Sequence, residues 1–351
     1  MAEYILISIV TVCLSFVVVR VKGKLQYVMI GVMAVPGAWL ASLRLNIGPD
    51  YQLYERVFNS IALTGDFFSV KELEEGYRLL NLAIAELGGN YQVLLFVVAW
   101  VIEFLFLVGA MRLSPNFTLS TALFFIMGFY FDSFNGLRQY IASAIIFFGI
   151  SCLARGGRRS AVVCCLIAFL FHRSAIFMLP VCFIIDKARL SSAKTVLVVI
   201  VVLLFGNYLY DGLVFILQYT PYSYYLESVE FVTEPTLGAT ILTTLITLVA
   251  LTFKVYSPKN LESVEHRLLT NYNLLALISS LLSFFIPLAL RVQYYFLPIE
   301  MVFLPYVLNS IENRNLRTLV GMVLVSAFAL MTIVGMVSNG WYGAYPYRMI
   351  G

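Results

Sequence analysis

Charge is scarce in this 351-residue chain. Asp, Glu, Lys and Arg together make up 12% of the residues, whereas soluble domains carry roughly 25%. Hydrophobic residues make up 61%, and the mean hydropathy is +0.90. Apolar runs long enough to cross a hydrocarbon core of about 30 Å recur from one end of the chain to the other. These features exclude an ordinary soluble protein and predict an all-α, polytopic integral membrane protein.

Motifs for nucleotides and metals are also missing. The chain has no P-loop and no G-x-G-x-x-G, and "ARGGRRS" at 154–160 lacks the required spacing. No D-x-D pair or His/Asp cluster offers metal ligands, and the five cysteines lie in apolar runs without C-x-x-C spacing. An ATP-driven pump and a cytoplasmic enzyme that uses a nucleotide sugar with magnesium are therefore disfavoured. We expect no cofactor, no metal and no nucleic acid partner.

The apolar runs predict about twelve membrane-spanning helices in a single transmembrane domain, residues 1–351. Two of these spans, at 160–171 and 174–186, are too short to cross comfortably at 1.5 Å per residue. The first run has no basic stretch before it and no small-residue cleavage site after it, so we expect a retained helix. The predicted spans are 4–19, 27–43, 91–111, 117–131, 138–154, 160–171, 174–186, 195–210, 237–254, 268–290, 292–310 and 318–337.

The distribution of cations predicts the orientation. One set of connections holds fifteen of the 23 Lys and Arg residues and the other set holds eight. Cytoplasmic loops are the ones enriched in cations, so the larger set is expected in the cytoplasm and both termini outside. Seven of the eight outward cations are arginine, which suggests two-point binding of phosphate or carboxylate. The outward set is Arg44, Arg56, Lys71, Arg78, Arg138, Arg173, Arg291 and Arg348.

Two outward loops, at about 44–90 and 211–236, are longer than ordinary connections. In the first, "SVKELEEGYRLLNLAIAEL" places apolar residues at helical spacing, which predicts an amphipathic helix on the membrane surface or over a cavity. The second is rich in tyrosine, and its rings are expected either to form an interfacial belt or to line a sugar path. These tyrosines are Tyr219, Tyr222, Tyr224 and Tyr225.

Polar residues at the mouths of membrane helices are costly and mark candidate functional sites. In "RLNIGPDYQLY" (44–54), Gly48 and Pro49 fix a turn, after which Asp50, Tyr51 and Tyr54 begin a new segment. Asp50 is placed to cap that segment, so a purely structural role remains open.

A second stretch, "FDSFNGLRQYIASAII" (131–146), places Asp132 before a turn and Arg138 and Gln139 on the first turn of a helix. A helix N-terminus favours an anion, and Arg138 adds a full positive charge. The alternative is an ordinary outer turn with an Asp132–Arg138 ion pair.

A third stretch, "LIAFLFHRSAIFMLP" (166–180), carries His172 and Arg173 at the turn between the two short spans. That turn is expected to lie below the outer surface, within a cavity. The other histidine, His266, lies in a charged cytoplasmic loop and is expected at the solvated surface.

The fourth stretch, "LALRVQYYFLPIE" (288–300), opens a returning span with Arg291, followed by Tyr294 and Tyr295. Together the four stretches predict one outward cavity with several guanidiniums, which repel one another unless an anionic ligand neutralises them. A diphosphate would do so. The residues expected at this cavity are Arg44, Asp50, Arg138, His172, Arg173 and Arg291.

In this order and spacing, the motifs resemble those of the EpsG-type branch of the Wzy polysaccharide polymerases, which assemble bacterial surface glycans in the membrane. The resemblance rests on R-x-x-x-G-x-D-Y-x-x-Y (44–54), F-N-G-L-R-Q-x-I-A (134–142), F-H-R-S-A (171–175), R-x-x-Y-Y (291–295) and the closing Y-P-Y (345–347). It implies a GT-C-like architecture in the bacterial inner membrane, with the active site facing the periplasm or exterior.

The implied substrates are undecaprenyl-diphosphate-linked oligosaccharides, as both donor and acceptor, in O-antigen, capsule or exopolysaccharide synthesis. Implied partners are the membrane lipid and, in the same pathway, a chain-length regulator and a flippase. Arginines would supply the stabilisation of the departing diphosphate that a metal gives elsewhere. We assign Arg138 and Arg291 to that role, with Arg173 assisting. Either His172 or Asp50 accepts the proton of the acceptor hydroxyl. The remaining expected substrate contacts are Arg44, Tyr51, Tyr54, Asp132, Gln139, Tyr294 and Tyr295.

Two other functions are compatible with such a chain. A flippase for the same lipid-linked unit would have to expose its cations to both faces in turn, whereas the unusual polar residues are expected on one side. A membrane O-acyltransferase is the third possibility, but the chain offers only one recessed histidine and no partner constellation for acyl transfer.

Overall fold

A computed structural model describes residues 1–68, 70, 73–219, 223, 237–286, 289–338 and 340–350. Within those ranges the regular secondary structure is helical and there is no strand, so the predicted all-α class is confirmed. A single isolated bridge joins Arg44 to Met349.

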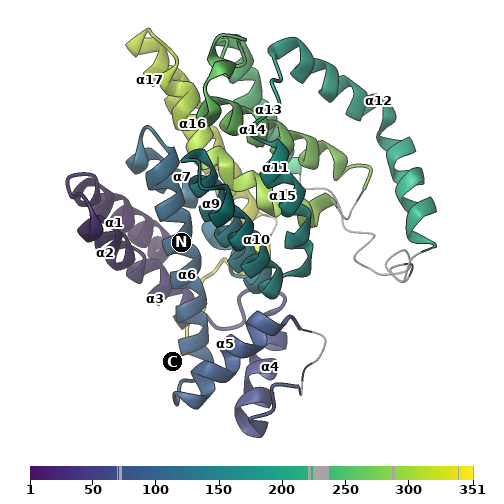
Figure 1. The fold of residues 1–351 in the computed structure, drawn as a ribbon. Helices are drawn as coiled ribbons and strands as arrows, with labels where there is room; N and C mark the ends of the chain where they lie inside the picture. Colours follow the sequence, from purple (N-terminus) through teal and green to yellow (C-terminus); the bar gives the residue numbers. More distant parts are fainter. Residues whose placement is uncertain are drawn as a thin grey trace.

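The helices follow one another along the whole chain (Figure 1). In the first half they are α1 (Ala2–Val18), α2 (Lys24–Met33), α3 (Val35–Leu43), α4 (Tyr51–Thr64), α5 (Glu75–Glu86), α6 (Tyr91–Leu113), α7 (Phe117–Ile126), α8 (Phe129–Asp132), α9 (Leu137–Ala154) and α10 (Arg158–Phe171). In the second half they are η1 (Arg173–Phe177), α11 (Met178–Ile184), α12 (Ser192–Leu217), α13 (Leu237–Thr252), η4 (Asn260–Glu262), α14 (Val264–Leu282), α15 (Ala289–Phe296), η5 (Leu297–Ile299), α16 (Glu300–Asn309), α17 (Arg314–Val337) and η6 (Trp341–Gly343).

Five helical stretches among the described residues are long and apolar enough to span a membrane: Lys24–Leu43, Tyr91–Leu113, Leu137–Ala154, Ser192–Ile216 and Arg314–Val337. The apolar runs predicted as spans do form helices, but several are short or broken. α10 has 14 residues, which at 1.5 Å per residue is about 21 Å. The run expected at 117–131 divides into α7 and α8 at Gly128, whose φ is +87°. The predicted twelve spans and the GT-C-like architecture are therefore not confirmed.

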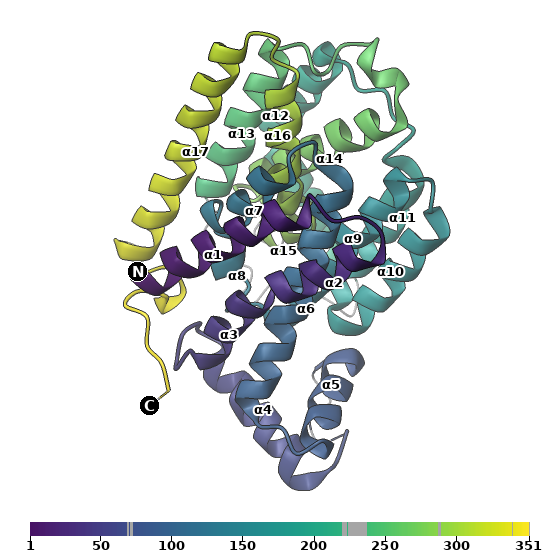
Figure 2. The same ribbon diagram turned by 90° about the vertical axis from the view of Figure 1, so that its left-hand side faces the viewer.

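α9 lies at the centre of the bundle, between α6 and α10. Most of its side chains are buried, including the small residues Ala142, Ser143 and Ala144, which allow neighbouring helices to approach closely. In contrast, α12 and α17 lie at the periphery and expose many large apolar side chains. α12 stands apart from the bundle in Figure 1 and α17 forms one flank in Figure 2. Such exposed apolar faces suit contact with lipid, which identifies a membrane protein.

α4 and α5 form a separate helical pair at one end of the bundle, seen at the bottom of both ribbon views (Figures 1 and 2). α5 is the amphipathic helix that the sequence predicts in the first outward loop, and its buried face includes Tyr77, Asn81 and Ile84. α4 is a second amphipathic helix, with Tyr51, Tyr54 and Phe58 buried. This end of the bundle carries most of the motif residues.

The C-terminal tail returns to the same end. The backbone N–H of Leu45 donates a hydrogen bond to the carbonyl of Arg348, and that of Ile350 donates to the carbonyl of Leu43, both at 2.9 Å. The hydroxyl of Tyr347 donates to the carbonyl of Leu40 at 2.6 Å. The closing Y-P-Y motif is therefore bound to the segment that precedes the first polar turn.

Candidate active site

The first and second polar motifs pack directly against each other. Gly48 has φ +98°, and a Cβ at this position would lie 2.9 Å from the carbonyl oxygen of Phe134. Only glycine allows this backbone conformation together with so close an approach. Next to it, the backbone N–H of Asp50 donates to Oδ1 of Asn135 at 3.2 Å. The turn at 44–50 is thereby fixed on the turn that begins α9.

The centre of the site is Glu74, which immediately precedes α5 and is 5% exposed. Oε2 of Glu74 forms an ion pair with Nη1 of Arg138. Oε1 lies 3.2 Å from Nδ1 of His172 and accepts a hydrogen bond from the backbone N–H of Arg173 at 3.3 Å. One carboxylate therefore joins α5, α9 and the turn between α10 and η1.

Close packing of α5 against α10 brings Glu74 to this position. A Cβ on Gly76 would lie 2.7 Å from the carbonyl oxygen of Leu170, so a larger residue would push α5 away. Leu170 lies two residues before His172. Gly76 therefore allows the contact between Glu74 and the histidine.

The surroundings of Glu74 keep its carboxyl group ionised. Burial alone raises its pKa, but the hydrogen bond from His172 and the charge of Arg138 outweigh that effect and lower the pKa to about 2. Glu74 is therefore a permanent anion at neutral pH, and Arg138 already has a counter-ion within the protein.

His172 is held on one side only. Its side chain is 13% exposed, and its Nδ1 makes the ion-pair contact with Glu74. Both ring nitrogens are buried, and neither makes an aligned hydrogen bond within the described part of the chain. The ring thus presents Nδ1 to a fixed carboxylate, while Nε2 faces no charged partner in the described ranges.

Arg138 lies on the first turn of α9, as the sequence predicts, with Gly136 as the residue before the helix. Its side chain is 21% exposed, and its guanidinium carbon lies 6.0 Å from the centre of the Tyr54 ring. Nε of Arg138 is buried without a hydrogen-bond partner among the described residues. The guanidinium therefore has one unsatisfied donor besides its contacts with Glu74 and Tyr54.

The fourth motif, on α15, packs against α9 and against η1, the short helix that follows His172. Nε2 of Gln139 donates to the carbonyl of Arg291 at 2.6 Å, and the hydroxyl of Ser143 donates to the carbonyl of Tyr294. Ser174 and Tyr295 share a hydrogen bond between their hydroxyls at 2.8 Å. The motifs around 138, 172 and 291, remote in sequence, therefore meet at one end of α9.

Arg44 does not line an open cavity. Its side chain is fully enclosed, with 1% exposure. Nη1 donates to the carbonyl of Ala41 at 2.6 Å, Nη2 donates to the carbonyl of Phe134 at 3.3 Å, and the guanidinium lies over the Phe134 ring. The groups around the guanidinium are backbone carbonyls and an aromatic face, and Nε is buried without a hydrogen-bond partner among the described residues. Arg44 is therefore enclosed by protein and does not face an open site. Tyr51 is likewise buried, with its ring against Tyr91.

Asp132 does not form the expected ion pair with Arg138, whose carboxylate partner is Glu74. Hydrogen bonds from Tyr140 and Trp341 reach its carboxyl group. Burial raises the pKa of Asp132 to about 7 despite those two bonds. Asp132 therefore links α9, through Tyr140, to the C-terminal segment, through Trp341.

Two further expectations concern residues outside this cluster. His266 is buried rather than solvated, because Nδ1 shares a hydrogen bond with the hydroxyl of Tyr306 and Nε2 with the carbonyl of Val255, both at 2.6 Å. The expectation of a surface position was therefore wrong. Of the loop tyrosines, Tyr219 is exposed after α12, whereas Tyr222, Tyr224 and Tyr225 lie outside the described residues.

The sequence analysis does not identify Glu74. Its segment predicts an amphipathic helix, and the motifs do not distinguish Glu74 from the neighbouring acids Glu72 and Glu75. One signal was available: Glu74 lies three residues before Tyr77 and so shares the apolar face of that helix. A carboxylate on the buried face of an amphipathic helix requires a partner.

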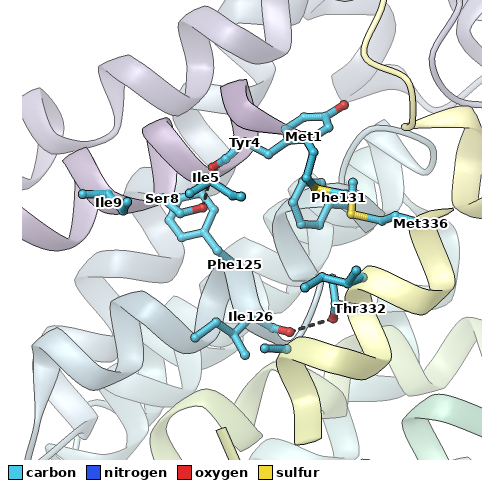
Figure 3. Close-up of a pocket in the computed structure, with 12 residues that line it drawn as sticks. Met1, Tyr4, Ile5, Ser8, Ile9, Phe125, Ile126, Phe131, Thr332 and Met336 are labelled. Atoms are coloured by element: carbon cyan, nitrogen blue, oxygen red, sulfur yellow. Dashed lines mark hydrogen bonds between the residues drawn. The ribbon is translucent and has the colours of Figure 1, made fainter. Parts of the chain in front are cut away.

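Two hollows in the surface lie away from this cluster. One, of about 190 Å³, is an apolar groove in which side chains of α1, α7 and α17 face one another (Figure 3). The hydroxyl of Thr332 donates to the carbonyl of Ile126 at its edge. The other, of about 430 Å³, lies between the starts of α7 and α17. Neither is lined by a residue of the Glu74 cluster. No group of three His, Cys, Asp or Glu side chains in the described ranges could hold a metal ion.

The fold and this cluster define an all-helical membrane protein with a polar, partly buried Glu–His–Arg site at one end of its bundle. The model of the EpsG family matches residues 27–349, a range that includes every candidate site residue. The chain therefore belongs to the EpsG-type polysaccharide polymerase family. No curated protein and no solved structure matches the chain.

Proposed function

We propose that this protein polymerises lipid-linked oligosaccharide repeat units at the outer face of the bacterial inner membrane. The growing glycan would move from undecaprenyl diphosphate to a sugar hydroxyl of the next lipid-linked unit. The observation that supports this most is the meeting of Arg138, His172 and the Arg291 segment, three parts of the family motifs, around one ionised carboxylate.

In the proposed step, the oxygen of the acceptor hydroxyl bonds to the anomeric carbon of the donor sugar. The bond between that carbon and the diphosphate oxygen breaks, and its electron pair stays on the diphosphate. The proton of the hydroxyl passes to a base of the protein. The products are a glycan longer by one repeat unit, undecaprenyl diphosphate and the protonated base.

Arg138 would bind the departing diphosphate. A guanidinium binds phosphate oxygens at two points and stabilises the charge that develops as the bond breaks. Its partly exposed side chain makes such contact feasible beside Glu74. We assign Arg291 to the same diphosphate because its backbone is held at Gln139, next to Arg138. Arg173, which is exposed beside the cluster, would assist.

His172 is the preferred base. Its unpartnered Nε2 is the type of atom that accepts a proton at neutral pH. Asp50 remains the alternative, since it begins α4 at the same end of the bundle. Tyr294, which is partly exposed, is proposed to contact the substrate sugars or their diphosphate. Tyr54 and Tyr295 are buried, and we propose that they support the site from beneath. Arg44 and Tyr51 are proposed to act indirectly, by holding the turn on which Asp50 lies.

The test uses purified protein in detergent micelles with an undecaprenyl-diphosphate-linked repeat unit. The proposal predicts a ladder of products that differ by one repeat unit. Micelles have no two sides, so a flippase would leave the unit unchanged. Acyl transfer would add a mass other than that of a repeat unit.

A further inference from the structure

We propose that Glu74 is a positioning residue for the reaction, which holds the ring of His172 so that Nδ1 carries the proton and Nε2 is free to accept one. This inference rests on the proposed function, because it assigns a role within the same site. It adds a residue that belongs to none of the motifs shared with the family.

The geometry of the two side chains supports this role. An ionised carboxylate is an acceptor only, so the nitrogen that faces it must carry a hydrogen. Nδ1 of His172 lies 3.2 Å from Oε1 of Glu74, which is an ion-pair distance without the alignment of a hydrogen bond. Nε2 is also buried and has no carboxylate beside it among the described residues. The tautomer of a neutral imidazole is set by the hydrogen bond of its other nitrogen. Glu74 therefore selects the form in which Nε2 has a lone pair.

The contacts of Glu74 with other residues fix its own position. Oε2 pairs with Arg138, and Oε1 also accepts from the backbone N–H of Arg173. Each oxygen of the carboxylate is thus bound, and the group cannot turn away from His172 without losing these contacts. The tyrosine rings of Tyr54 and Tyr77 lie nearby on α4 and α5.

The same carboxylate would stabilise the product of proton transfer. When Nε2 accepts the hydroxyl proton, the imidazole becomes a cation beside a buried anion. That cation would lie beside the carboxylate, with Nδ1 at 3.2 Å from Oε1. Glu74 itself stays ionised, so it orients and stabilises His172 and does not take up the proton.

Because the chain has only two histidines, ¹⁵N NMR of histidine-labelled protein can report the tautomer directly. His172→Gln assigns the signals, since His266 then remains alone. In the neutral wild-type protein we expect Nδ1 of His172 to be protonated and Nε2 unprotonated. In Glu74→Gln, whose neutral amide is a weaker acceptor than a carboxylate, we expect the form protonated at Nε2 to appear. Wild-type protein with the proton on Nε2 would overturn the inference, even if every Glu74 variant failed to fold.

The kinetic test compares Glu74→Gln with Glu75→Gln. Both remove one negative charge, and the two positions are adjacent. The side chain of Glu75, however, is 53% exposed and forms an ion pair with Arg78 on its own helix. Glu74→Gln should lower kcat about 10²–10⁴-fold with little change in KM for the acceptor. Glu74→Asp should recover part of that loss, and Glu75→Gln should behave as wild type. Equal rates for Glu74→Gln and wild type would contradict the role. A wild-type protein that forms no ladder but shows the expected tautomer would contradict the proposed function instead.

Discussion

The guanidinium of Arg44 lies 4.7 Å from the centre of the Phe134 ring and donates a hydrogen bond to the carbonyl oxygen of the same residue. This pairing joins the first polar turn to the turn before α9. It helps to explain why an arginine can be buried completely at this end of the bundle, since the cation lies over an aromatic face and Nη1 and Nη2 both donate hydrogen bonds, although Nε is buried without a partner among the described residues. Arg44 thus differs from Arg138, whose side chain is partly exposed.

A substitution at Arg44 should therefore act mainly on stability. In Arg44→Lys, a single ammonium group cannot replace the two guanidinium donors, and carbonyls of Ala41 and Phe134 lose their bonds. We expect a loss of about 1–3 kcal/mol in stability, measured as a lower unfolding temperature in micelles. The exposed Arg56→Lys is the matched control. An unchanged unfolding temperature for Arg44→Lys would contradict the structural role.

Arg138→Lys should lose most polymerase activity while it remains folded. Lysine keeps the charge and its pairing with Glu74, but it cannot bind a diphosphate at two points. The measurement is the initial rate of ladder formation at equal amounts of folded protein, with Arg56→Lys again as control. Near-normal rates would show that charge alone suffices and that Arg138 does not form the proposed two-point contact.

His172→Ala and Asp50→Asn distinguish the two candidate bases. Loss of a general base costs about 10²–10⁴-fold in rate, so only one of these substitutions should have the full effect. From the free Nε2 of His172 we expect the larger loss in His172→Ala, with binding of the lipid-linked unit retained. If Asp50→Asn shows the larger loss and His172→Ala remains active, Asp50 is the base and the histidine is structural.

The order of helices and the grouping of the polar motifs could be predicted from the sequence, because hydrophobic runs and isolated polar turns leave a local signal. Helix lengths could not. The run at 117–131 is continuous in hydropathy, yet Gly128 breaks it. Twelve spans are expected, whereas five helical stretches in the described part of the chain are long and apolar enough to cross. Whether a run stays straight depends on packing against other helices.

The site shows the same limit. Arg138, Gln139 and His172 stood out because a polar residue in an apolar setting is unusual. Glu74 lies in a polar segment, where nothing distinguishes a buried acid from a solvated one except its helical face. Arg44 and His266 were misplaced because their partners, the carbonyls of Phe134 and Val255 among them, are remote in sequence or carry no sequence signature.

Acid should weaken the protein partly through Glu74. Its pKa is about 2 in the folded protein against an ordinary 4.5, so folding favours the ionised form. The stabilisation, on the order of 3 kcal/mol, is fully present above about pH 4.5 and is lost as the pH falls through about 2. Glu74→Gln should therefore unfold at a lower temperature than wild type at pH 6, and this difference should shrink toward pH 2. A difference independent of pH would exclude Glu74 as its source, and Glu75→Gln controls for the change in net charge.

Removal of divalent metal should leave the reaction unaffected. The proposed step assigns the diphosphate charge to arginines, so excess chelator is expected to change neither the rate nor the length of the ladder. Activity that disappears with chelator and returns with magnesium or manganese would refute this arginine-based mechanism. Arg138→Lys assayed in parallel shows whether the measured rate depends on the site.

The central claim is that glycan is transferred from a lipid diphosphate at the Arg138–His172 site. Its most direct measurement is the stoichiometry of the purified protein acting on a repeat unit labelled in both sugar and lipid. The account predicts one undecaprenyl diphosphate released for each new glycosidic bond in the wild-type protein, and neither product in Arg138→Lys or His172→Ala. Lipid release without chain growth, or chain growth at wild-type rate in both variants, would contradict it.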